Sequence, residues 1–466
     1  MTKSMTKIFI RDKAFYKSVF RLLIPFATMS AMSLVLNFCD VFMLGKLGEA
    51  SEAAISAASI ANRPFFLFSM VMFGSTSGAM VLASQYWGKK ELRTINSIAG
   101  TTLIFLLAVC TVFLTVCYSF SHQLMRLLSN DQAVIELAVI YLRIILISFI
   151  PSTFTGVFSG ILRTTENVKI PLIANSIAIG TNILLNYLLI FGNFGFPELG
   201  IRGAALGTLI ARIVELCIIL VYIIFFEKTV QFTLKKIFNI PVVIVKDFFK
   251  YSIPVILNEA VWGFGVTIHA GIIGQISKEQ YAAYTISNMV EQISVLTMIG
   301  FSSSACILIG KAIGAGEDKD TVAQYARTFQ GLAGIFAFLA ALTVLCIRIP
   351  VINIFDIGDE TKYYAERLLL VVSAMVLIKT FNCVSVVGIF RGGGDTRTGM
   401  IIDLLAMYSV GIPLGAMAKF IFNLDVPFVY MFLVCDELVK LPIFFTRIKS
   451  RKWIKNITRD NIASIK

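Results

Sequence analysis

The sequence predicts an all-α membrane protein with twelve transmembrane helices, in two six-helix lobes related by a pseudo-two-fold axis along the membrane normal. The first observation is composition. Of the 466 residues, 57% are hydrophobic and only 15% are charged, whereas soluble proteins carry about 25% charged residues. The mean hydropathy of +0.82 also excludes an intrinsically disordered chain. The other two observations are twelve long apolar stretches and an internal repeat.

A helix needs roughly 20 mainly apolar residues to cross a bilayer, and twelve stretches meet that length. They run near residues 20–43, 60–85, 95–119, 134–158, 168–191, 203–226, 249–274, 284–310, 322–347, 364–390, 398–421 and 427–446. Their connections are short and rich in Gly, Pro, Asn and charged residues. The longest connection predicts a cytoplasmic linker at 227–248, between a first lobe at 1–226 and a second lobe at 249–466 that ends in a basic tail.

The positive charge of the chain indicates its orientation in the membrane. With the N-terminus inside, about 27 Lys and Arg fall in inside segments and eight in outside loops. This bias follows the positive-inside rule, so we expect both termini to be cytoplasmic in the cell membrane. The net charge of +13 does not indicate nucleic-acid binding, because no basic face is interleaved with aromatic residues.

The two halves of the chain repeat each other. At an offset of 229 residues, Pro25 corresponds to Pro254 and Gly45 corresponds to Gly274. At nearby offsets, GILRTTEN at 160–167 corresponds to GIFRGGGD at 388–395, and Gly88 corresponds to Gly314. Six spans in each half bring both halves into the membrane in the same sense, which gives a parallel repeat. Transporters built in this way hold substrate between the halves.

Several classes of protein are excluded by missing motifs. The only histidines are His122 and His269, and no HExxH pattern occurs, so we expect no enzyme and no catalytic residue. ATP-driven transport by this chain is not expected, because the GxxxxGK[ST] phosphate loop is absent. The eight cysteines form no CxxC pair, which leaves no indication of zinc or of a disulfide framework.

The order and spacing of several motifs resemble the multidrug and toxin extrusion (MATE) transporters, bacterial type, over essentially the whole chain. These motifs are NFCDVFMLGKLG, SQYWGKKE, GILRTTENVKIPL, TNILLNYLLIFGNFGFPELGIRGAALGT, IPVILNEAVWGFG, GKAIGAGE and RGGGDTRTGMIID. The resemblance implies a secondary-active exporter that exchanges organic, often cationic, compounds for Na+ or H+ as two lobes rock. A lipid-linked oligosaccharide flippase of the same superfamily is the alternative.

Asp40 is the leading candidate for ion coupling in the first half. An acid within a span is costly, and no opposite charge lies three or four residues further along. The alternative is an aspartate that reaches the outer membrane interface. The resemblance implies that Asn182, Asn186 and Thr208 complete a cation site that binds Na+ or H+. Many relatives carry Asp at the position of Asn186, so this chain has one negative charge fewer there.

The second half offers Glu259, which follows Pro254 on the seventh span and resembles an acid of the family. Asp395 matches the acid after the RGxx pattern, although Asp is also ordinary in a short turn. Asp403 is a further candidate for coupling or substrate binding. Lys379 lies near the centre of the tenth span without an acidic neighbour at helical spacing, and we expect Glu259 to be its partner.

Trp262 is a candidate substrate contact, because its ring offers a cation–π face three residues after Glu259. Two pairs have the spacing of neutralising neighbours on a helix, namely Arg212 with Glu215 and Asp436 with Lys440. We expect small organic substrates and the lipid bilayer to be the partners, the chain to be a monomer, and no cofactor beyond the coupling ion. The sequence does not decide between Na+ and H+.

Overall fold

The computed structural model describes residues 9–10, 12–47, 51–233, 237, 239–355 and 357–460. Helices and their connections make up these residues, and no strand occurs among them. The first half contains α1 (Lys13–Leu44), α2 (Ser51–Ala61), α3 (Arg63–Gly88), α4 (Leu92–Ser119), α5 (Ser121–Arg126), α6 (Gln132–Ile147), α7 (Phe149–Thr164), α8 (Lys169–Phe191), the turn η2 (Asn193–Gly195) and α9 (Ile201–Phe225). The first eight and the last six residues lie outside the described part, so the orientation of the termini stays a prediction.

The second half continues this helical pattern and adds two short π-helical segments. It contains α11 (Val242–Ile273), α12 (Lys278–Gly314), α13 (Lys319–Ile352), α14 (Asp359–Cys383), η3 (Val384–Phe390), α15 (Thr396–Ala406), η4 (Met407–Gly411), α16 (Ile412–Phe420), α17 (Val426–Leu433) and α18 (Asp436–Lys449). The π segments η3 and η4 join consecutive helices, so α14–η3 and α15–η4–α16 each continue as one apolar span.

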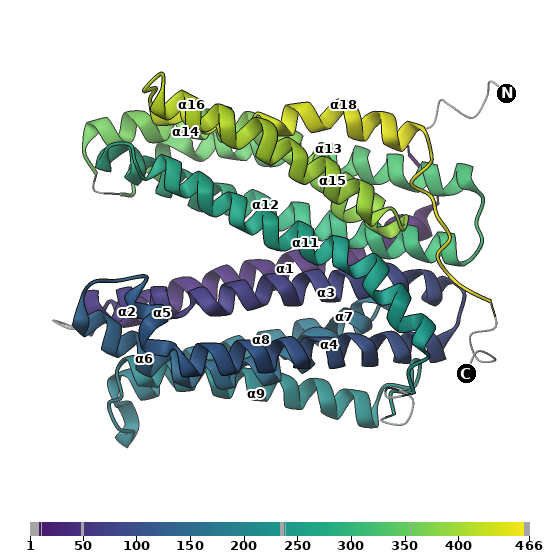
Figure 1. The fold of residues 1–466 in the computed structure, drawn as a ribbon, viewed down its shortest axis with the longest axis horizontal. Coiled ribbons are helices and arrows are strands. Elements are labelled where there is room, and N and C mark those ends of the chain that lie inside the picture. Colours follow the sequence, from purple (N-terminus) through teal and green to yellow (C-terminus); the bar gives the residue numbers. More distant parts are fainter. Residues whose placement is uncertain are drawn as a thin grey trace. The chain divides into compact units, whose positions relative to one another are not determined.

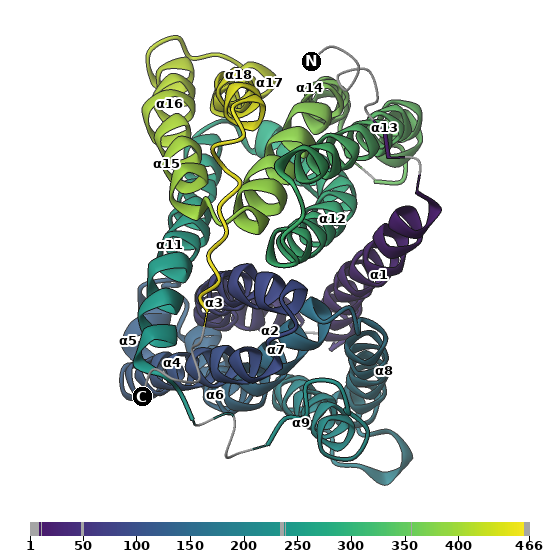
Figure 2. The ribbon, with the colours of Figure 1, turned by 90° about the vertical axis from the view of Figure 1, so that its right-hand side faces the viewer.

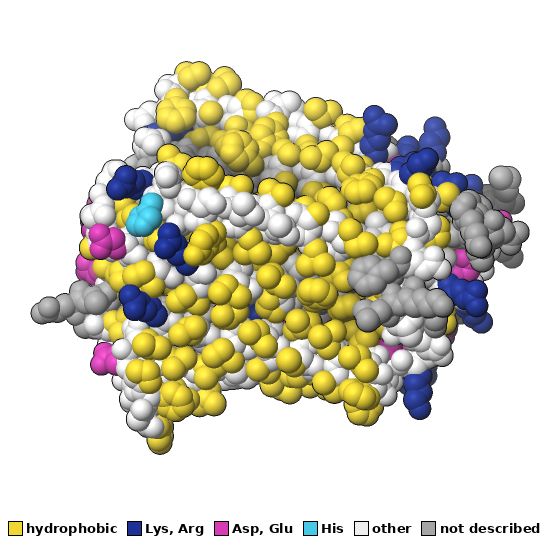
Figure 3. Space-filling model, turned by 60° about the horizontal axis from the view of Figure 1, so that its bottom comes forward, with side chains coloured by type: hydrophobic (Ala, Val, Ile, Leu, Met, Phe, Trp, Pro, Cys, Tyr) yellow, Lys and Arg dark blue, Asp and Glu magenta, His cyan; other side chains and the backbone are white. Residues whose placement is uncertain are grey.

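Each predicted span is helical in the structure. Within the described residues, nine helices are long and apolar enough to cross a membrane, and α6 with α7, bent by 43°, gives a tenth. The remaining two predicted spans correspond to α12, whose polar residues include Glu291, and to the α17–α18 pair, which is broken near Val434. The predicted all-α membrane class is therefore confirmed. On the face drawn in Figure 3, hydrophobic side chains cover the helices and the Lys and Arg side chains gather toward the ends.

The chain folds into two compact units. The N-unit consists of Thr28–Ala83 and Glu91–Lys250, and the C-unit consists of residues up to Ala27, Ser84–Lys90 and Tyr251–Asp460. In the N-unit, the rings of Phe68 and Phe149 stack with centroids 4.8 Å apart at the centre of the core. In the C-unit, α12 to α18 run alongside one another in green and yellow (Figure 1). The expected lobe boundary at 227–248 stays a prediction.

Residues 450–460, which follow α18, form a tail that packs on the C-unit. Figure 2 shows this tail in yellow, running from α18 toward the end of α3. The Nε2 atom of Gln85 donates to the carbonyl of Lys455 at 3.1 Å, and the Gln85 Oε1 atom accepts from the Ile457 amide at 2.9 Å. Lys89 pairs with Asp460 at 2.7 Å, and Trp453 is fully buried. The predicted basic tail thus packs against the C-unit up to Asp460, the last described residue.

Two glycines that correspond in the repeat pack into one contact of the C-unit. A Cβ atom on Gly88 would lie 2.0 Å from the carbonyl oxygen of Lys311, and one on Gly314 would lie 1.8 Å from the carbonyl oxygen of Gln85. Both distances are far inside van der Waals contact, so the ends of α3 and α12 approach this closely only with glycine at both positions. The SQYWGKKE and GKAIGAGE motifs therefore have a packing role.

Replacing Trp453 with Ala should lower the free energy of unfolding by about 3–5 kcal/mol, the usual cost of truncating a buried large aromatic side chain. The indole is fully buried, and its Nε1 donates to the carbonyl of Ile448 at 3.1 Å. Thermal unfolding of the purified protein in detergent measures the effect. Lys452→Ala, next to it in the tail, should change the melting temperature little. Equal melting temperatures for the Trp453 variant and the parent protein would contradict a packed tail.

Candidate functional site

The four residues expected at the first-half cation site lie together in the N-unit. Asp40 comes from α1, Asn182 and Asn186 from one face of α8, and Thr208 from α9. Asn186 Nδ2 donates to Asp40 Oδ1 at 2.6 Å and to Asn182 Oδ1 at 3.0 Å. Asn182 Nδ2 in turn donates to Thr208 Oγ1 at 3.0 Å. We call these four residues the Asp40 cluster.

Oxygen atoms face one another inside the Asp40 cluster. In the orientation just given, Asn182 Oδ1 lies 3.1 Å from Asp40 Oδ1, a distance at which two acceptors repel unless a proton or cation lies between them. Rotating the Asn182 amide by half a turn places its nitrogen there instead. Asn186 is fully buried, and its Oδ1 atom has no hydrogen-bond partner among the described residues. The Asn182 oxygen thus lies beside the carboxylate in this orientation, whereas the unpartnered Asn186 oxygen lies against Gly207 of α9.

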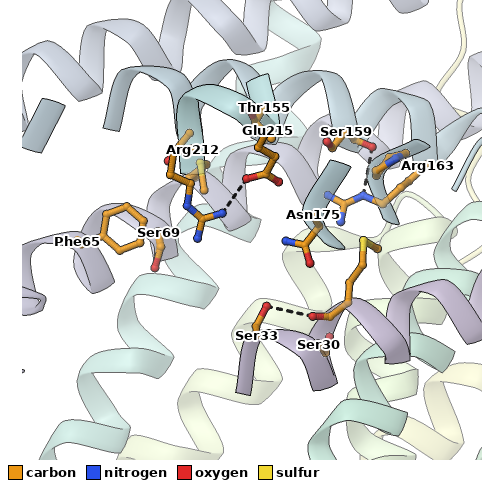
Figure 4. A pocket seen from close by; sticks show the side chains of 15 residues that line it. Ser30, Ser33, Phe65, Ser69, Thr155, Ser159, Arg163, Asn175, Arg212 and Glu215 are labelled. Carbon is orange, nitrogen blue, oxygen red and sulfur yellow. Dashed lines mark hydrogen bonds and ion pairs between the residues drawn. The ribbon is translucent and has the colours of Figure 1, made fainter. Parts of the chain in front are cut away.

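A cavity of about 350 Å³ lies in the same unit. Helices α1, α3, α7, α8 and α9 contribute its walls (Figure 4). Its polar lining consists of Ser30, Ser33, Ser69, Ser152, Thr155, Ser159, Arg163, Asn175, Arg212 and Glu215, and its apolar lining of Met29, Phe65, Met72, Gly156 and Pro171. The Oγ of Ser152 and the Oγ1 of Thr155 are buried and have no partner in the described part of the chain. These hydroxyls therefore have no internal hydrogen bond to lose on turning toward a bound molecule.

The cavity and the Asp40 cluster share two helix faces. On α8, Asn175 of the cavity lies seven residues before Asn182, which is two turns along one face. On α9, Thr208 of the cluster is followed one turn later by Arg212 of the cavity. Arg212 Nη1 and Glu215 Oε2 are 2.8 Å apart, which confirms the expected pair. The sequence did not indicate that the pair lines a cavity. The available signal was the presence of two opposite charges within one apolar span.

The candidates of the second half lie in a network of ion pairs in the C-unit. Glu259 Oε1 pairs with Arg391 Nη2 at 2.6 Å. Asn258 accepts from Arg391 and donates to Asp403, and Asp403 pairs with Lys440 at 2.8 Å. Lys440 also contacts Asp436 at 2.7 Å, as expected, and Glu437 at 3.2 Å. The network thus gives a basic partner to each of these acids.

The expected partner of Lys379 is wrong. Lys379 Nζ pairs with Glu291 Oε1 at 2.5 Å and donates to the Tyr430 hydroxyl at 3.0 Å, while Glu259 pairs with Arg391. The hydroxyl of Tyr430 also donates to Glu291 Oε2 at 2.6 Å. Lys379 and Glu291 are 88 residues apart and come from α14 and α12, so helical spacing within one segment does not reveal the pair.

Trp262 is 41% exposed and does not line the cavity of the N-unit. The structure thus brings together the four first-half candidates, whereas Glu259, Asp403 and Lys379 lie in ion pairs of the C-unit. The charged side chains that line the cavity of the N-unit, Arg163, Arg212 and Glu215, come from α7 and α9.

Asp395 holds the segment after η3 in place. It is buried and pairs with Arg447 at 2.6 Å and with Lys455 at 2.7 Å. Burial alone would raise the pKa of this carboxyl, but the hydrogen bonds from Lys455, Arg447 and Thr398 outweigh burial and hold the pKa below its ordinary value. This arrangement supports the structural interpretation of the turn.

The ion pairs of Asp395 predict a pH-dependent contribution to stability. Because folding lowers the pKa, the contribution is complete above the unfolded value of about 3.9 and is lost as the pH falls through the lower folded value. Asp395→Asn should therefore reduce the melting temperature at pH 7, and the difference from the parent protein should shrink below about pH 4. A difference that stays constant from pH 7 to pH 3 would contradict this assignment.

A model of the MatE family matches residues 25–188 and again residues 254–417. The second match starts 229 residues after the first (254 against 25) and ends 229 residues after it (417 against 188), at the offset of the internal repeat. The chain belongs to the MatE family. This MatE protein is 27% identical over 457 residues to the probable multidrug resistance protein NorM of Thermotoga maritima, covering 96% of each chain. It is 24% identical to the probable multidrug resistance protein YoeA of Bacillus subtilis, covering 86% of each.

Solved structures show the same fold for this MatE protein. A MATE in the bent conformation aligns with a TM-score of 0.85 at 17% identity, over 94% of this chain and 96% of the other. A MOP superfamily transporter of Pyrococcus furiosus aligns with a TM-score of 0.84 at 18% identity, over 94% and 96%. The eukaryotic MATE transporter AtDTX14 aligns with a TM-score of 0.80 at 17% identity, over 94% and 98%. The resemblance seen in the motifs is confirmed at the level of family and fold.

Proposed function

We propose that this MatE protein is a secondary-active multidrug exporter that exchanges organic compounds, often cationic, for Na+ or H+ at the Asp40 cluster. The observation that carries the proposal is the position of the Asp40 carboxylate. It contacts the neutral amide of Asn186, and its cluster shares faces of α8 and α9 with the cavity. The names of the relatives, probable multidrug resistance proteins of Thermotoga maritima and Bacillus subtilis, also support a role in the export of organic compounds. Transport of this kind requires no catalytic residue.

The Asp40 cluster fits a proton or a monovalent cation. Na+ would take oxygens from Asp40, Asn182, Asn186 and Thr208. The Asn186 amide, whose Nδ2 faces Asp40, would turn to offer its unpartnered Oδ1 to the ion. A transition metal fits poorly, because no group of three His, Cys, Asp or Glu side chains within the described residues is placed to hold one. A bound cation supplies the positive charge that neutralises the Asp40 carboxylate.

Asp40 is favoured over Glu259 because of their neighbours. Glu259 has Arg391 at 2.6 Å, so an ion that entered there would compete with a guanidinium already in place. The nearest partner of Asp40 is the neutral amide of Asn186 at 2.6 Å. Asp40 is half-buried, and a carboxylate whose nearest partner is a neutral amide gains more from a proton or cation than one already paired with a guanidinium. The first-half candidates are therefore the proposed coupling site.

The cavity of the N-unit is the proposed substrate site. Its volume of about 350 Å³ lies in the range of small-molecule pockets, which is roughly 300–1,000 Å³. Met29, Met72 and Phe65 offer soft apolar surface that adapts to varied substrates, while the free hydroxyls offer polar contacts. We propose that the protein acts as a monomer in the cell membrane with both termini in the cytoplasm, as its charge distribution indicates.

A lipid-linked oligosaccharide flippase remains a second candidate, because Arg163 and Arg212 both line the cavity and guanidinium groups suit phosphate-bearing headgroups. Flipping of a fluorescent polyprenyl-diphosphate lipid in proteoliposomes distinguishes it from a drug exporter. Flipping without dye efflux would favour this second candidate.

The test of the main proposal is efflux of cationic dyes from proteoliposomes, with Na+ and proton gradients imposed separately. We expect one of the two gradients to drive dye transport against its concentration gradient, and collapse of that gradient by an ionophore to stop it. Empty liposomes under the same gradients serve as the control. Dye movement that responds to neither gradient would overturn the antiporter proposal.

A further inference from the structure

Arg212 lies between two carboxylates of the N-unit. Toward the cavity, its Nη1 atom is 2.8 Å from Glu215 Oε2 (Figure 4). Toward the Asp40 cluster, Thr208 precedes Arg212 by one turn of α9, a rise of about 5.4 Å. Thr208 contacts the Asn182 amide at 3.0 Å, and the other end of that amide lies 3.1 Å from Asp40 Oδ1. The long, flexible side chain of Arg212 therefore lies between two possible partners, the carboxylates of Glu215 and Asp40.

Glu215 is the only acid that lines the cavity, within the part of the chain that the structure describes. Its side chain is 8% exposed. Ser152 and Thr155, whose hydroxyls have no partner in the described residues, line the same cavity. An organic cation that enters the cavity meets this carboxylate as its counter-charge and the ring of Phe65 as a cation–π surface. To pair with Glu215, the ligand competes with Arg212.

Other charged and titratable groups face these two acids. Arg163 of α7 lines the cavity and donates from Nε to the carbonyl of Ser159 at 3.2 Å, and its charge interacts with that of Glu215. Tyr141 of α6 is buried in the same unit and accepts from Asn62 Nδ2 at 3.4 Å. Arg212 lies 2.8 Å from Glu215 and follows Thr208 of the Asp40 cluster by one turn of α9.

We propose that Arg212 moves between Glu215 and Asp40, so that an organic cation in the cavity and the coupling ion at Asp40 exclude each other without sharing a binding site. This inference rests on the proposed function and explains how exchange arises. Three positive groups change places, namely Arg212, the substrate and the coupling ion, and they serve two carboxylates, while Arg163 stays bonded to the carbonyl of Ser159. In a low-dielectric interior each carboxylate is best neutralised by one positive charge, and a surplus charge is costly.

The two states follow from that balance. When an organic cation pairs with Glu215, the Arg212 guanidinium turns toward Asp40 and takes the place of the coupling ion. When Na+ or H+ neutralises Asp40, Arg212 returns to Glu215 and weakens the hold on the substrate. Arg212 is a positioning residue in this scheme, and Glu215 contacts the substrate. The substrate class is an organic cation small enough for a cavity of about 350 Å³.

The test measures binding of ethidium, a planar organic cation, to the purified protein in nanodiscs by fluorescence anisotropy. The titration is repeated at low and high Na+ and at pH 5.5 and 8. For the parent protein we expect the coupling ion to raise the ethidium Kd by about 5- to 150-fold, the usual range of coupling between two sites. For Arg212→Gln we expect an ethidium Kd that no longer depends on either ion.

Glu215→Gln should weaken ethidium binding by at least about tenfold, which corresponds to the loss of about 1.4 kcal/mol. Because Arg212→Gln leaves Glu215 without its closest partner, the double variant Arg212→Gln/Glu215→Gln is measured as well, and its Kd should also be independent of the ions. Arg348→Gln, which removes a guanidinium from the Arg348–Glu366 pair of the C-unit, is the matched control and should keep the ion dependence of the parent.

Two results would overturn the proposal. One is an unchanged ion dependence of the ethidium Kd in a folded Arg212→Gln variant or in the double variant. The other is a parent protein that binds no ethidium. Failure of the proposed function is recognised separately, since it requires that neither gradient drives dye efflux by the parent protein. Gradient-driven efflux together with an unchanged ion dependence in the Arg212 variants rejects the moving arginine alone.

Discussion

Asp40→Asn is expected to abolish gradient-driven efflux while the protein stays folded. The substitution keeps the size of the side chain and its contact with Asn186, which lies 2.6 Å away, but removes the group that takes up a proton or balances Na+. Coupling free energies between two sites are about 1–3 kcal/mol, so the ion-dependent change in substrate affinity, roughly 5- to 150-fold, should disappear. The measurement is dye efflux from proteoliposomes under Na+ or proton gradients, normalised to reconstituted protein.

The matched control for this change is Asp131→Asn, another acid-to-amide substitution in the N-unit. Asp131 caps α6 by accepting from the amides of Ala133 and Val134, and Asn caps helices about as well as Asp. This variant should transport like the parent protein. Full gradient-driven efflux by Asp40→Asn at normal protein levels would rule out Asp40 as the coupling residue.

Lys440→Met is expected to cost about 3–5 kcal/mol of stability, as breaking a buried ion pair usually does. The Nζ atom of Lys440 lies within 3.2 Å of Asp403, Asp436 and Glu437, and its side chain is 1% exposed. Without the lysine, three carboxylates remain together in the interior of the C-unit. The measurement is the melting temperature and the yield of monodisperse protein after solubilisation in detergent.

A second substitution tests whether charge is the cause. Lys440→Met combined with Asp436→Asn removes one of the stranded carboxylates and should recover part of the lost stability. Lys278→Met, at an exposed position of the same unit, is the control for the loss of a lysine and should behave like the parent. A shift in melting temperature of about 1 °C or less corresponds to almost no change in stability. A shift that small for Lys440→Met would contradict a stabilising role for Lys440.

Contacts within one helix were the most predictable part of the site. Asn182 and Asn186 are four residues apart, so their common face follows from helical geometry, and the Arg212–Glu215 and Asp436–Lys440 pairs follow for the same reason. That Asp40 and Thr208 join the two asparagines came from family resemblance. The sequence periodicity of one helix does not give the register of that helix against another.

Contacts between helices explain what the sequence did not predict. Lys379 has a suitable acid both in Glu259 and in Glu291, and only the packing of α12 against α14 decides for Glu291. The cavity was also hidden, because Ser and Thr in helices commonly bond to their own chain four residues back. Thr153 does so, with the carbonyl of Phe149 at 2.8 Å, whereas its neighbours Ser152 and Thr155 have no partner in the described part of the chain.

The tail that packs against the end of α3 has a consequence for biosynthesis. Gln85 and Lys455 are 370 residues apart in the chain, and at about 5–20 residues per second the ribosome needs roughly 20–75 s to synthesise the residues between them. During that interval the buried amide of Gln85 lacks its partners in the tail. The third helix of the nascent chain therefore reaches its final contacts only after the tail has been synthesised, and a product truncated before Trp453 leaves the end of that helix without them.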